Sequence, residues 1–172
     1  MIEKSTTWTV LENFFTNPTT EFHLRELSRL LGKSMPTIIS STDKLSEKNL
    51  IIKIKGKVIT KLMANRENVK FLQYKRLYNL KMIYDSDVLL FISKAYNNPR
   101  LVALFGSYSR GEDTEDSDID IAVVTNKKIA LDMTKFEKKL QRRISIHEVE
   151  LERVSNEFKA NLANGIVLEG SW

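Results

Sequence analysis

The chain has 172 residues, of which 42% are apolar and 28% are charged, and this composition predicts a folded globular protein and excludes a disordered one. It contains no cysteine, which excludes disulfides and thiolate metal sites. No run of about 18 apolar residues occurs, and the first ten residues carry an acid and a lysine where a secretory signal needs an apolar segment. We therefore expect a cytoplasmic protein that has no membrane partner.

Charge is distributed unevenly along the chain. The first hundred residues carry a net charge of +8, and the remainder carries −3. A basic front half suggests a polyanionic partner, although lysine-rich surfaces are also common on proteins that bind no nucleic acid. An acidic centre in the back half suggests a cation site. The two halves therefore predict different ligands.

Three helices are predicted in the first 47 residues. Apolar side chains recur at helical spacing in "TTWTVLENFF" and again in "EFHLRELSRLL", which stops at Gly32. Ser34 is a good N-cap for the third helix, whose first turn tolerates Pro36. The side chains of this helix that we expect to point inward are Ile38, Ile39, Thr42 and Leu45.

A β-hairpin is predicted next, in "LIIKIKGKVITKL". Isoleucine and valine alternate with lysine around Gly56, which is typical of two strands with one solvent-exposed, basic face. Three helices followed by a hairpin resemble the winged helix-turn-helix family over roughly residues 5–64. In such a module a helix fits the major groove of DNA and the hairpin, or wing, reaches the adjacent backbone.

This resemblance implies a set of contacts with double-stranded DNA. Small hydroxyls and one lysine on the outer side of the third helix suit close approach to phosphates and base edges, and the wing lysines add salt-dependent affinity. The candidate DNA-binding residues are Arg25, Thr37, Ser40, Ser41, Lys44, Lys53, Lys55 and Lys57. The alternative is that the helix residues are only the polar side of an amphipathic helix, in a module that docks proteins or dimerises.

Two more helices are predicted between residues 65 and 99, with a break near Asp85–Asp87. The first carries interleaved tyrosines, lysines and arginines, which can stack on nucleic acid but which we expect to bridge two domains or to form a dimer interface. We predict a homodimer whose interface lies within residues 71–92.

The most informative stretch is "LFGSYSRGEDTEDSDIDIAVV", residues 104–124. "RLVALFG" and "DIDIAVV" are predicted as buried strands, joined by a turn and a short helix. Asp118 and Asp120 point to the same side of their strand, about 7 Å apart, and form a hard oxygen site suited to Mg²⁺. Gly106 permits a tight turn in which backbone N–H groups and the Ser107 hydroxyl close around an anion.

These residues resemble the nucleotidyltransferase family of the DNA polymerase beta superfamily, in particular its minimal, single-domain members, over about residues 86–170. The resemblance implies a nucleoside triphosphate substrate, two Mg²⁺ ions and transfer of a nucleoside monophosphate to an acceptor hydroxyl. Asp118 and Asp120 would carry the metals and act as the catalytic residues. The implied nucleotide-binding residues are Gly106, Ser107, Arg110 and Ser117. Arg110 has an alternative role, as a surface ion pair with Glu112 or Asp113.

The sequence departs from the family at one position. Active members usually carry a third carboxylate on a later strand, and in "RRISIHEVE" the aligned residue is Ser145. A serine cannot act as the base. His147 shares the side of that strand with Ser145, whereas Glu148 and Glu150 have the opposite parity. His147 can replace the acid or can be a hydrogen-bonded structural residue.

The sequence therefore predicts an α+β protein of two domains: a winged helix-turn-helix at residues 1–64, a helical connector at 65–84, and a minimal nucleotidyltransferase domain with a mixed sheet at 85–172. Three functions remain open. The chain is an enzyme recruited by its winged helix, a nucleotide-sensing transcriptional regulator with weak or absent catalysis, or an antitoxin-like subunit with a helical protein partner.

Overall fold

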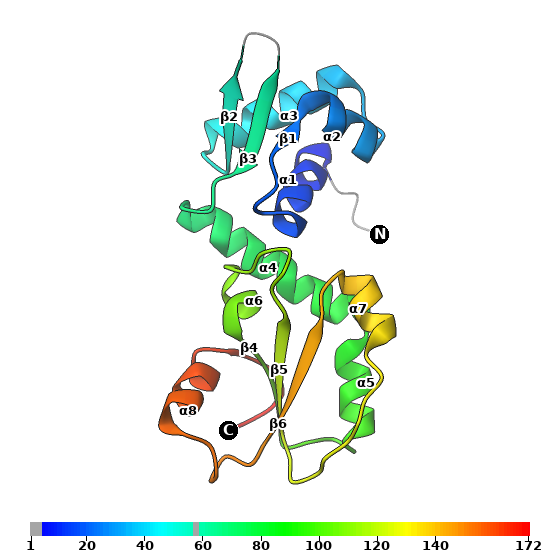
Figure 1. Cartoon of the computed structure of the whole chain (residues 1–172), viewed down its shortest axis with the longest axis vertical. Coiled ribbons are helices and arrows are strands. Elements are labelled where there is room, and N and C mark those ends of the chain that lie inside the picture. The colour runs from blue at the N-terminus through cyan, green and yellow to red at the C-terminus, as the bar shows by residue number, and fades with distance from the viewer. Residues whose placement is uncertain (1–4, 57–58) are drawn as a thin grey trace. The chain divides into compact units, whose positions relative to one another are not determined.

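The structure is a computed structural model, and it describes residues 5–56 and 59–172. The chain divides into two compact units, residues 1–75 and residues 76–172, which are described separately here. The division falls within the long helix α4 (Val69–Ser86), in the stretch for which the sequence predicts a connector (Figure 1). Among the described residues, no helix is long and apolar enough to cross a membrane.

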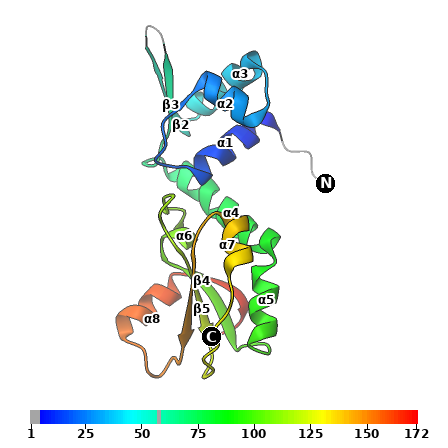
Figure 2. The ribbon, with the colours of Figure 1, turned by 45° about the vertical axis from the view of Figure 1, so that its right-hand side comes forward.

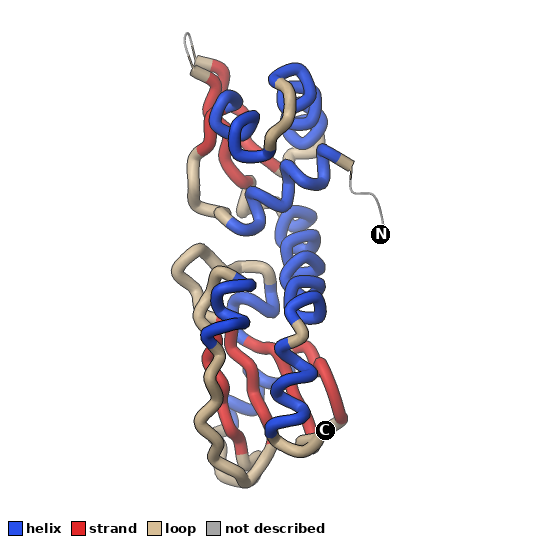
Figure 3. The backbone as a smooth tube through the Cα atoms, turned by 90° about the vertical axis from the view of Figure 1, so that its right-hand side faces the viewer, coloured by secondary structure: helices blue, strands red, loops and turns tan. Residues whose placement is uncertain are grey.

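The first unit combines three helices with a small antiparallel sheet. In chain order its elements are α1 (Thr6–Thr16), β1 (Phe22–His23), α2 (Leu24–Leu31), α3 (Met35–Glu47), β2 (Ile51–Lys55) and β3 (Thr60–Ala64). The strands β2 and β3 form the predicted hairpin, and the short strand β1 pairs with the other side of β3. Figure 3 shows these strands as one group beside the three helices.

Capping residues mark the ends of these helices, including Ser34 and Gly32, which the sequence predicts. Ser5 caps α1 by accepting a hydrogen bond from the Trp8 N–H, and Ser34 caps α3 by accepting one from the Thr37 N–H. Gly32 ends α2 in the left-handed conformation, with φ of 60°. These caps satisfy backbone groups that the first and last helical turns leave without partners.

The packing of α3 differs from the prediction at two residues. Ile39 is 39% exposed, whereas Ser41 is only 4% exposed and accepts a hydrogen bond from the Thr7 hydroxyl. The buried stripe consists of Ile38, Ser41, Thr42 and Leu45. This stripe follows the i, i+3, i+4, i+7 spacing of one helix face, so the prediction that Ser41 faces outward is wrong.

The hairpin also buries a different face from the one predicted. Ile51 is buried, while Ile52 and Ile54 are 42% and 48% exposed. Because side chains alternate along a strand, Lys53 then lies on the same side as Ile51, and its side chain is only 6% exposed. The prediction that Lys53 belongs to a solvent-exposed, basic face is therefore wrong. The buried face of β2 is the one that carries Ile51, whereas the prediction placed Ile52 on it.

The second unit is built around a four-stranded mixed sheet. After α4 its elements are α5 (Val88–Ala95), β4 (Leu101–Phe105), α6 (Gly106–Arg110), β5 (Ile119–Val124), α7 (Thr134–Leu140), β6 (Ile144–Val149), α8 (Asn156–Ala163) and β7 (Ile166–Gly170). The strand order is β6-β5-β4-β7; the neighbours β5 and β6 pair in parallel, and β4 pairs antiparallel with both β5 and β7. The mixed sheet and the strands at residues 101–105 and 119–124 agree with the prediction, whereas α7 was not predicted.

Both faces of this sheet are covered, which explains the continuous apolar sequences of β4 and β5. Val102 and Leu104 pack in the same core as Ile92 of α5, whereas Phe105 packs in a separate cluster with Leu162 of α8. Figures 1 and 2 show α5 and α8 on opposite sides of the sheet. The two central strands, β4 and β5, therefore bury alternate residues on opposite faces of the sheet.

Glu148 anchors β6 on the α5 side of the sheet. Its Oε1 accepts hydrogen bonds from the Tyr96 hydroxyl at 2.8 Å and from the Ile129 N–H at 2.6 Å, and Lys128 lies near its Oε2. Burial raises the pKa of Glu148, but these bonds and the Lys128 charge outweigh it and hold the pKa below its usual value. Glu148 thus has the predicted parity, opposite to that of His147.

Candidate active site on strands β5 and β6

Two carboxylates lie where the loop after α6 enters β5. Asp118 directly precedes the strand and Asp120 is its second residue, while Ile119 and Ile121 are fully buried. Because side chains alternate along a strand, both aspartates stand on the side opposite the two isoleucines. The isoleucines pack in the main core, so they fix the direction of the carboxylates.

Gly106 brings the turn after β4 against Asp120. Its φ is +73°, a conformation that favours glycine. A Cβ atom added to Gly106 would lie 2.5 Å from Oδ2 of Asp120, a distance that real side chains do not adopt. The turn and the carboxylate are in contact because residue 106 has no side chain.

The neighbouring strand β6 supplies a hydrogen-bonding partner for each aspartate. The hydroxyl of Ser145 donates to Oδ2 of Asp118 at 3.1 Å, and Nε2 of His147 lies 3.0 Å from Oδ1 of Asp120. Parallel pairing puts Ser145 level with Asp120 and His147 level with Ala122. The predicted shared face of Ser145 and His147 is present, and it is turned toward the aspartates.

The His147 ring is held by aromatic contacts as well as by Asp120. Its centroid lies 5.0 Å from that of Phe105 and 6.3 Å from that of Phe158 on α8. Its side chain is 38% exposed. These contacts fix the plane of the ring, so His147 orients Asp120 and keeps one side open to solvent.

The oxygen donors fit a divalent cation only in part. Asp118 and Asp120 offer hard carboxylate oxygens, which suit Mg²⁺. Within the described ranges, no three His, Asp or Glu side chains converge as a complete metal site. An ion held here would therefore complete its coordination shell with substrate oxygens and water.

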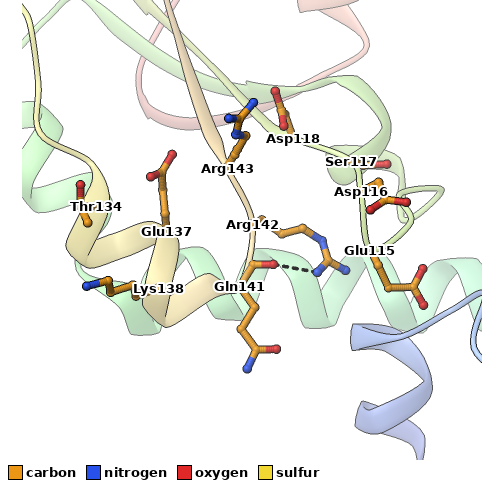
Figure 4. Close-up of a pocket in the computed structure, with 10 residues that line it drawn as sticks. All are labelled: Glu115, Asp116, Ser117, Asp118, Thr134, Glu137, Lys138, Gln141, Arg142 and Arg143. Carbon is orange, nitrogen blue, oxygen red and sulfur yellow. Dashed lines mark hydrogen bonds between the residues drawn. The ribbon is translucent and has the colours of Figure 1, made fainter.

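A pocket of about 560 Å³ opens beside Asp118. Ten residues from the loop before β5, from α7 and from the connection between α7 and β6 line it: Glu115, Asp116, Ser117, Asp118, Thr134, Glu137, Lys138, Gln141, Arg142 and Arg143. Figure 4 shows the α7 side chains on one side, the loop side chains on the other, and Asp118 with Arg143 at one end. Gly106, Ser107 and Asp120 do not line this pocket, so it adjoins the aspartates from one side only.

A buried polar network supports the loop that carries Asp118. The Asn79 side chain of α4 donates to the Tyr108 carbonyl at 2.8 Å and to Oδ1 of Asp113 at 2.7 Å, and Arg142 lies 3.9 Å from Oδ2 of Asp113. Asn79 and Asp113 are 2% and 1% exposed. Burial, and next the Asp113 charge, raise the pKa of Tyr108. Nothing in the local sequence around Asn79 or Asp113 signals this network.

The other predicted nucleotide-binding residues have local partners. The Arg110 guanidinium donates to Glu112 at 2.7 Å, and both side chains are about half exposed. The Ser117 hydroxyl accepts a hydrogen bond from the Thr114 N–H at 2.9 Å and so stabilises the turn before Asp118. Ser107 follows Gly106 in the first turn of α6 and is partly exposed.

The predicted DNA-binding residues of the first unit lie in three separate places. Thr37, Ser40, Ser41 and Lys44 line one pocket together with residues 5–7 at the start of α1. Arg25 lines another of about 640 Å³ with Arg29, Met35, Ile59 and Thr60. Lys53 and Lys55 line a third with Asp43 and Glu47. Lys57 lies outside the described residues.

Lys53 is held by its neighbours on α3. Its ammonium group donates to Oδ1 of Asp43 at 2.8 Å and to the Thr42 hydroxyl at 3.1 Å. The hydrogen bond from Lys53 lowers the pKa of Asp43. This lysine therefore ties the hairpin to α3, while Lys55 is exposed.

Comparison with known proteins identifies the second unit. Residues 89–171 match the model of the family described as polymerase beta, nucleotidyltransferase. The search of curated proteins and the search of solved structures gave no match. Residues 89–171 are therefore similar to a nucleotidyltransferase domain of the polymerase beta family, and this stretch contains the aspartates, the Gly106 turn and the pocket.

Proposed function

We propose that the domain at residues 89–171 binds a nucleoside triphosphate with Mg²⁺ and transfers the nucleoside monophosphate to an acceptor hydroxyl. The observation that carries this proposal is the contact between Asp120 and the Gly106 turn, where a Cβ atom on residue 106 would displace the Asp120 carboxylate. A turn that needs glycine beside a carboxylate is expected where phosphates and a cation meet. The match to the nucleotidyltransferase family supports the same activity.

Each residue has a role in this proposal. Asp118 and Asp120 would hold the cation, which neutralises phosphate charge and acidifies the attacking hydroxyl when it is bound. Ser107 and the backbone of the turn would bind the terminal phosphates. Arg110 would leave its ion pair with Glu112 and contact phosphate oxygens instead. His147 orients Asp120 through the hydrogen bond between them.

Labelling tests the transfer directly. The full chain is incubated with Mg²⁺ and each of ATP, GTP, CTP and UTP labelled on the α-phosphate, together with a cell extract as the source of acceptors. We expect label in an acceptor with at least one nucleotide, and we expect Asp118→Asn to abolish it. Asp87→Asn is the matched control, because Asp87 is exposed and has a φ of 65°, which asparagine adopts readily. Label that persists in Asp118→Asn would disprove the assignment.

A nucleotide sensor without transfer is the second candidate. Ser145 favours it, because a hydroxyl that donates to Asp118 stands where active relatives have their third carboxylate. Equilibrium dialysis with labelled nucleotide distinguishes the two. Binding that Asp118→Asn weakens, without any labelled acceptor, supports the sensor, whereas labelled acceptor supports the enzyme.

We also propose that the first unit is a winged helix that binds double-stranded DNA. Support comes from the order of three helices and a hairpin, and from two exposed arginines on α2, Arg25 and Arg29, beside the start of α3. Lys44, Ser40 and Thr37 add polar groups along α3. These side chains suit phosphate contacts more than base contacts.

The salt dependence of DNA binding tests this second proposal. Each lost phosphate contact reduces the slope of log K against log salt concentration by about 0.9. We expect Arg25→Gln and Lys44→Gln each to reduce the slope by about this amount, and Arg66→Gln, an exposed change outside all three pockets, to leave it unchanged. Equal slopes in all four proteins would contradict the proposed surface.

A further inference from the structure

We infer that a pocket in the first unit binds a small organic monoanion, namely a carboxylate joined to an apolar body. The pocket has a volume of about 640 Å³ and is lined by the start of α2, the start of α3 and the hairpin. We name it the arginine pocket, after Arg25 and Arg29 in its lining. The inference depends neither on nucleotidyl transfer nor on DNA binding.

Two cationic side chains give the arginine pocket its charge. Arg25 and Arg29 are four residues apart on α2, so they lie on the same side of the helix, one turn apart. Both are exposed, and neither forms an ion pair within residues 5–56 and 59–172. A guanidinium group can bind a carboxylate through two parallel N–H···O bonds. The two arginines therefore suit a ligand that brings anionic oxygen atoms into the pocket.

Glu26 limits the charge of that ligand. Its side chain also lines the pocket and accepts a hydrogen bond from the His23 N–H at 3.1 Å, which holds the carboxylate at the start of α2. Two arginines against one glutamate leave a formal surplus of one positive charge in the lining. A monoanion neutralises this surplus, whereas a dianion exceeds it and is repelled by Glu26.

Three apolar side chains from different elements line the same pocket. Leu24 begins α2, Met35 begins α3, and Ile59 directly precedes β3. Leu24 and Met35 are partly buried, while Ile59 is 51% exposed. A ligand that covered them would remove apolar surface from water. The volume also lies within the range of about 300 to 1,000 Å³ of small-molecule sites, which combine apolar side chains with a few polar groups.

These apolar side chains distinguish the inferred ligand from the backbone of DNA. A phosphodiester group is also a monoanion that arginine binds. It offers Met35 and Ile59 no apolar group to contact, and it would cover them with charged oxygen atoms that prefer water. A carboxylate with an aliphatic or aromatic body contacts the arginines and the apolar side chains at the same time. It is therefore the ligand that the whole lining favours.

Amide spectra of the full ¹⁵N-labelled chain test binding in the absence of DNA, nucleotide and metal. The probes are benzoate, phenylbutyrate and octanoate. Dimethyl phosphate is the control that carries the charge without an apolar body, and benzyl alcohol is the control that carries an apolar body without the charge. We expect at least one acid to cause saturable shifts at residues 24–26, Met35 and Thr60, with a dissociation constant of about 1 mM or lower. Both controls should bind at least about fivefold more weakly.

Two matched pairs of variants locate the site. Arg29→Gln should weaken the affinity at least about fivefold, whereas Arg66→Gln, which changes an exposed arginine outside the pocket, should not alter it. Ile59→Ser should weaken the affinity about threefold or more. Ile54→Ser should not, although Ile54 is exposed to a similar extent, at 48%. All four changes are made at exposed side chains, so the amide spectra should remain those of the folded chain.

Either of two results would overturn the inference. Absence of saturable shifts at these residues with all three acids would show that the arginine pocket holds no such ligand. Dimethyl phosphate that binds as tightly as the best acid would show that the apolar side chains contribute nothing, and it would assign the two arginines to phosphate contacts such as those with DNA. Neither result bears on nucleotidyl transfer, which the labelling experiment measures separately.

Discussion

The candidate nucleotide site and the candidate DNA surface differ in how their residues come together. In the second unit, Gly106, Asp118 and Asp120 converge with Ser145 and His147 on adjacent strands. In the first unit, the predicted DNA-binding residues divide among three pockets, and Ser41 and Lys53 are largely buried. A candidate site on neighbouring strands is thus easier to predict from sequence than a binding surface formed by several helices and a hairpin.

The difference has a physical cause. Strand alternation and the stereochemistry of glycine fix the direction of Asp118, Asp120 and residue 106 within a few residues. The outer face of α3 depends instead on how α1 and the hairpin pack against it, and these contacts are distant in sequence. Ser41 is buried because Thr7 lies over it, which no pattern around residue 41 indicates.

The largest expected effect comes from a pair of glycine substitutions, one in each unit. Both Gly106 and Gly32 have positive φ, but a Cβ at Gly106 would strike Asp120, whereas one at Gly32 meets nothing within 4 Å. We expect Gly106→Ala to lower the free energy of unfolding by about 2 to 4 kcal/mol and to weaken nucleotide binding at least tenfold. Gly32→Ala should cost about 1 kcal/mol, from backbone strain alone.

Urea unfolding and equilibrium dialysis measure these two effects. The Gly32→Ala protein is the control, since it carries the same chemical change and similar strain without the contact. If both variants lose the same stability and bind nucleotide equally well, the close approach of Asp120 to the turn is not important. Residue 106 would then tolerate a side chain as well as residue 32 does.

Acid should weaken the second unit through Glu148. The folded-state pKa of Glu148 is lowered, so its contribution to stability is present above the ordinary pKa of a glutamate and is lost as pH falls through the folded value. Glu148→Gln should therefore cost about 1 to 2 kcal/mol at neutral pH, and this cost should shrink as pH falls below the ordinary pKa of a glutamate and through the lower folded-state pKa. Urea unfolding across this pH range checks it. Parallel curves for the two proteins at all pH values would contradict the role of the ionised carboxylate.

Much of the fold follows from the sequence, and what was missed depends on distant contacts. The caps Ser5 and Ser34, the break between α4 and α5, and the two central strands are encoded by nearby residues. The helix α7 was missed because its amphipathic pattern is short and charged, although Phe136 and Leu140 pack in the main core. The polar lining of the pocket at Asp118 could not be predicted without α7.

Two lysines on β2 separate a structural role from DNA binding. Lys53 bonds Asp43 and Thr42, whereas Lys55 is exposed. We expect Lys53→Gln to lower stability by about 1 kcal/mol with no change in the salt slope of DNA binding. Lys55→Gln should leave stability unchanged and reduce the slope by about 0.9. The reverse result would contradict the structural role of Lys53 and the DNA contact proposed for Lys55.

A small change in stability is expected for Arg110→Gln in the second unit. The ion pair with Glu112 joins two exposed side chains, and such pairs contribute less than about 1 kcal/mol, so urea unfolding should change very little. If Arg110 leaves Glu112 to contact the nucleotide, the same variant should still weaken nucleotide binding about threefold to tenfold, because a charge-assisted hydrogen bond to phosphate is lost. Glu112→Gln is the control, because it removes the ion pair and keeps the arginine. Equal nucleotide affinity in Arg110→Gln and wild type would assign Arg110 to the surface pair alone, and the nucleotide site would then depend on the Gly106 turn and the aspartates.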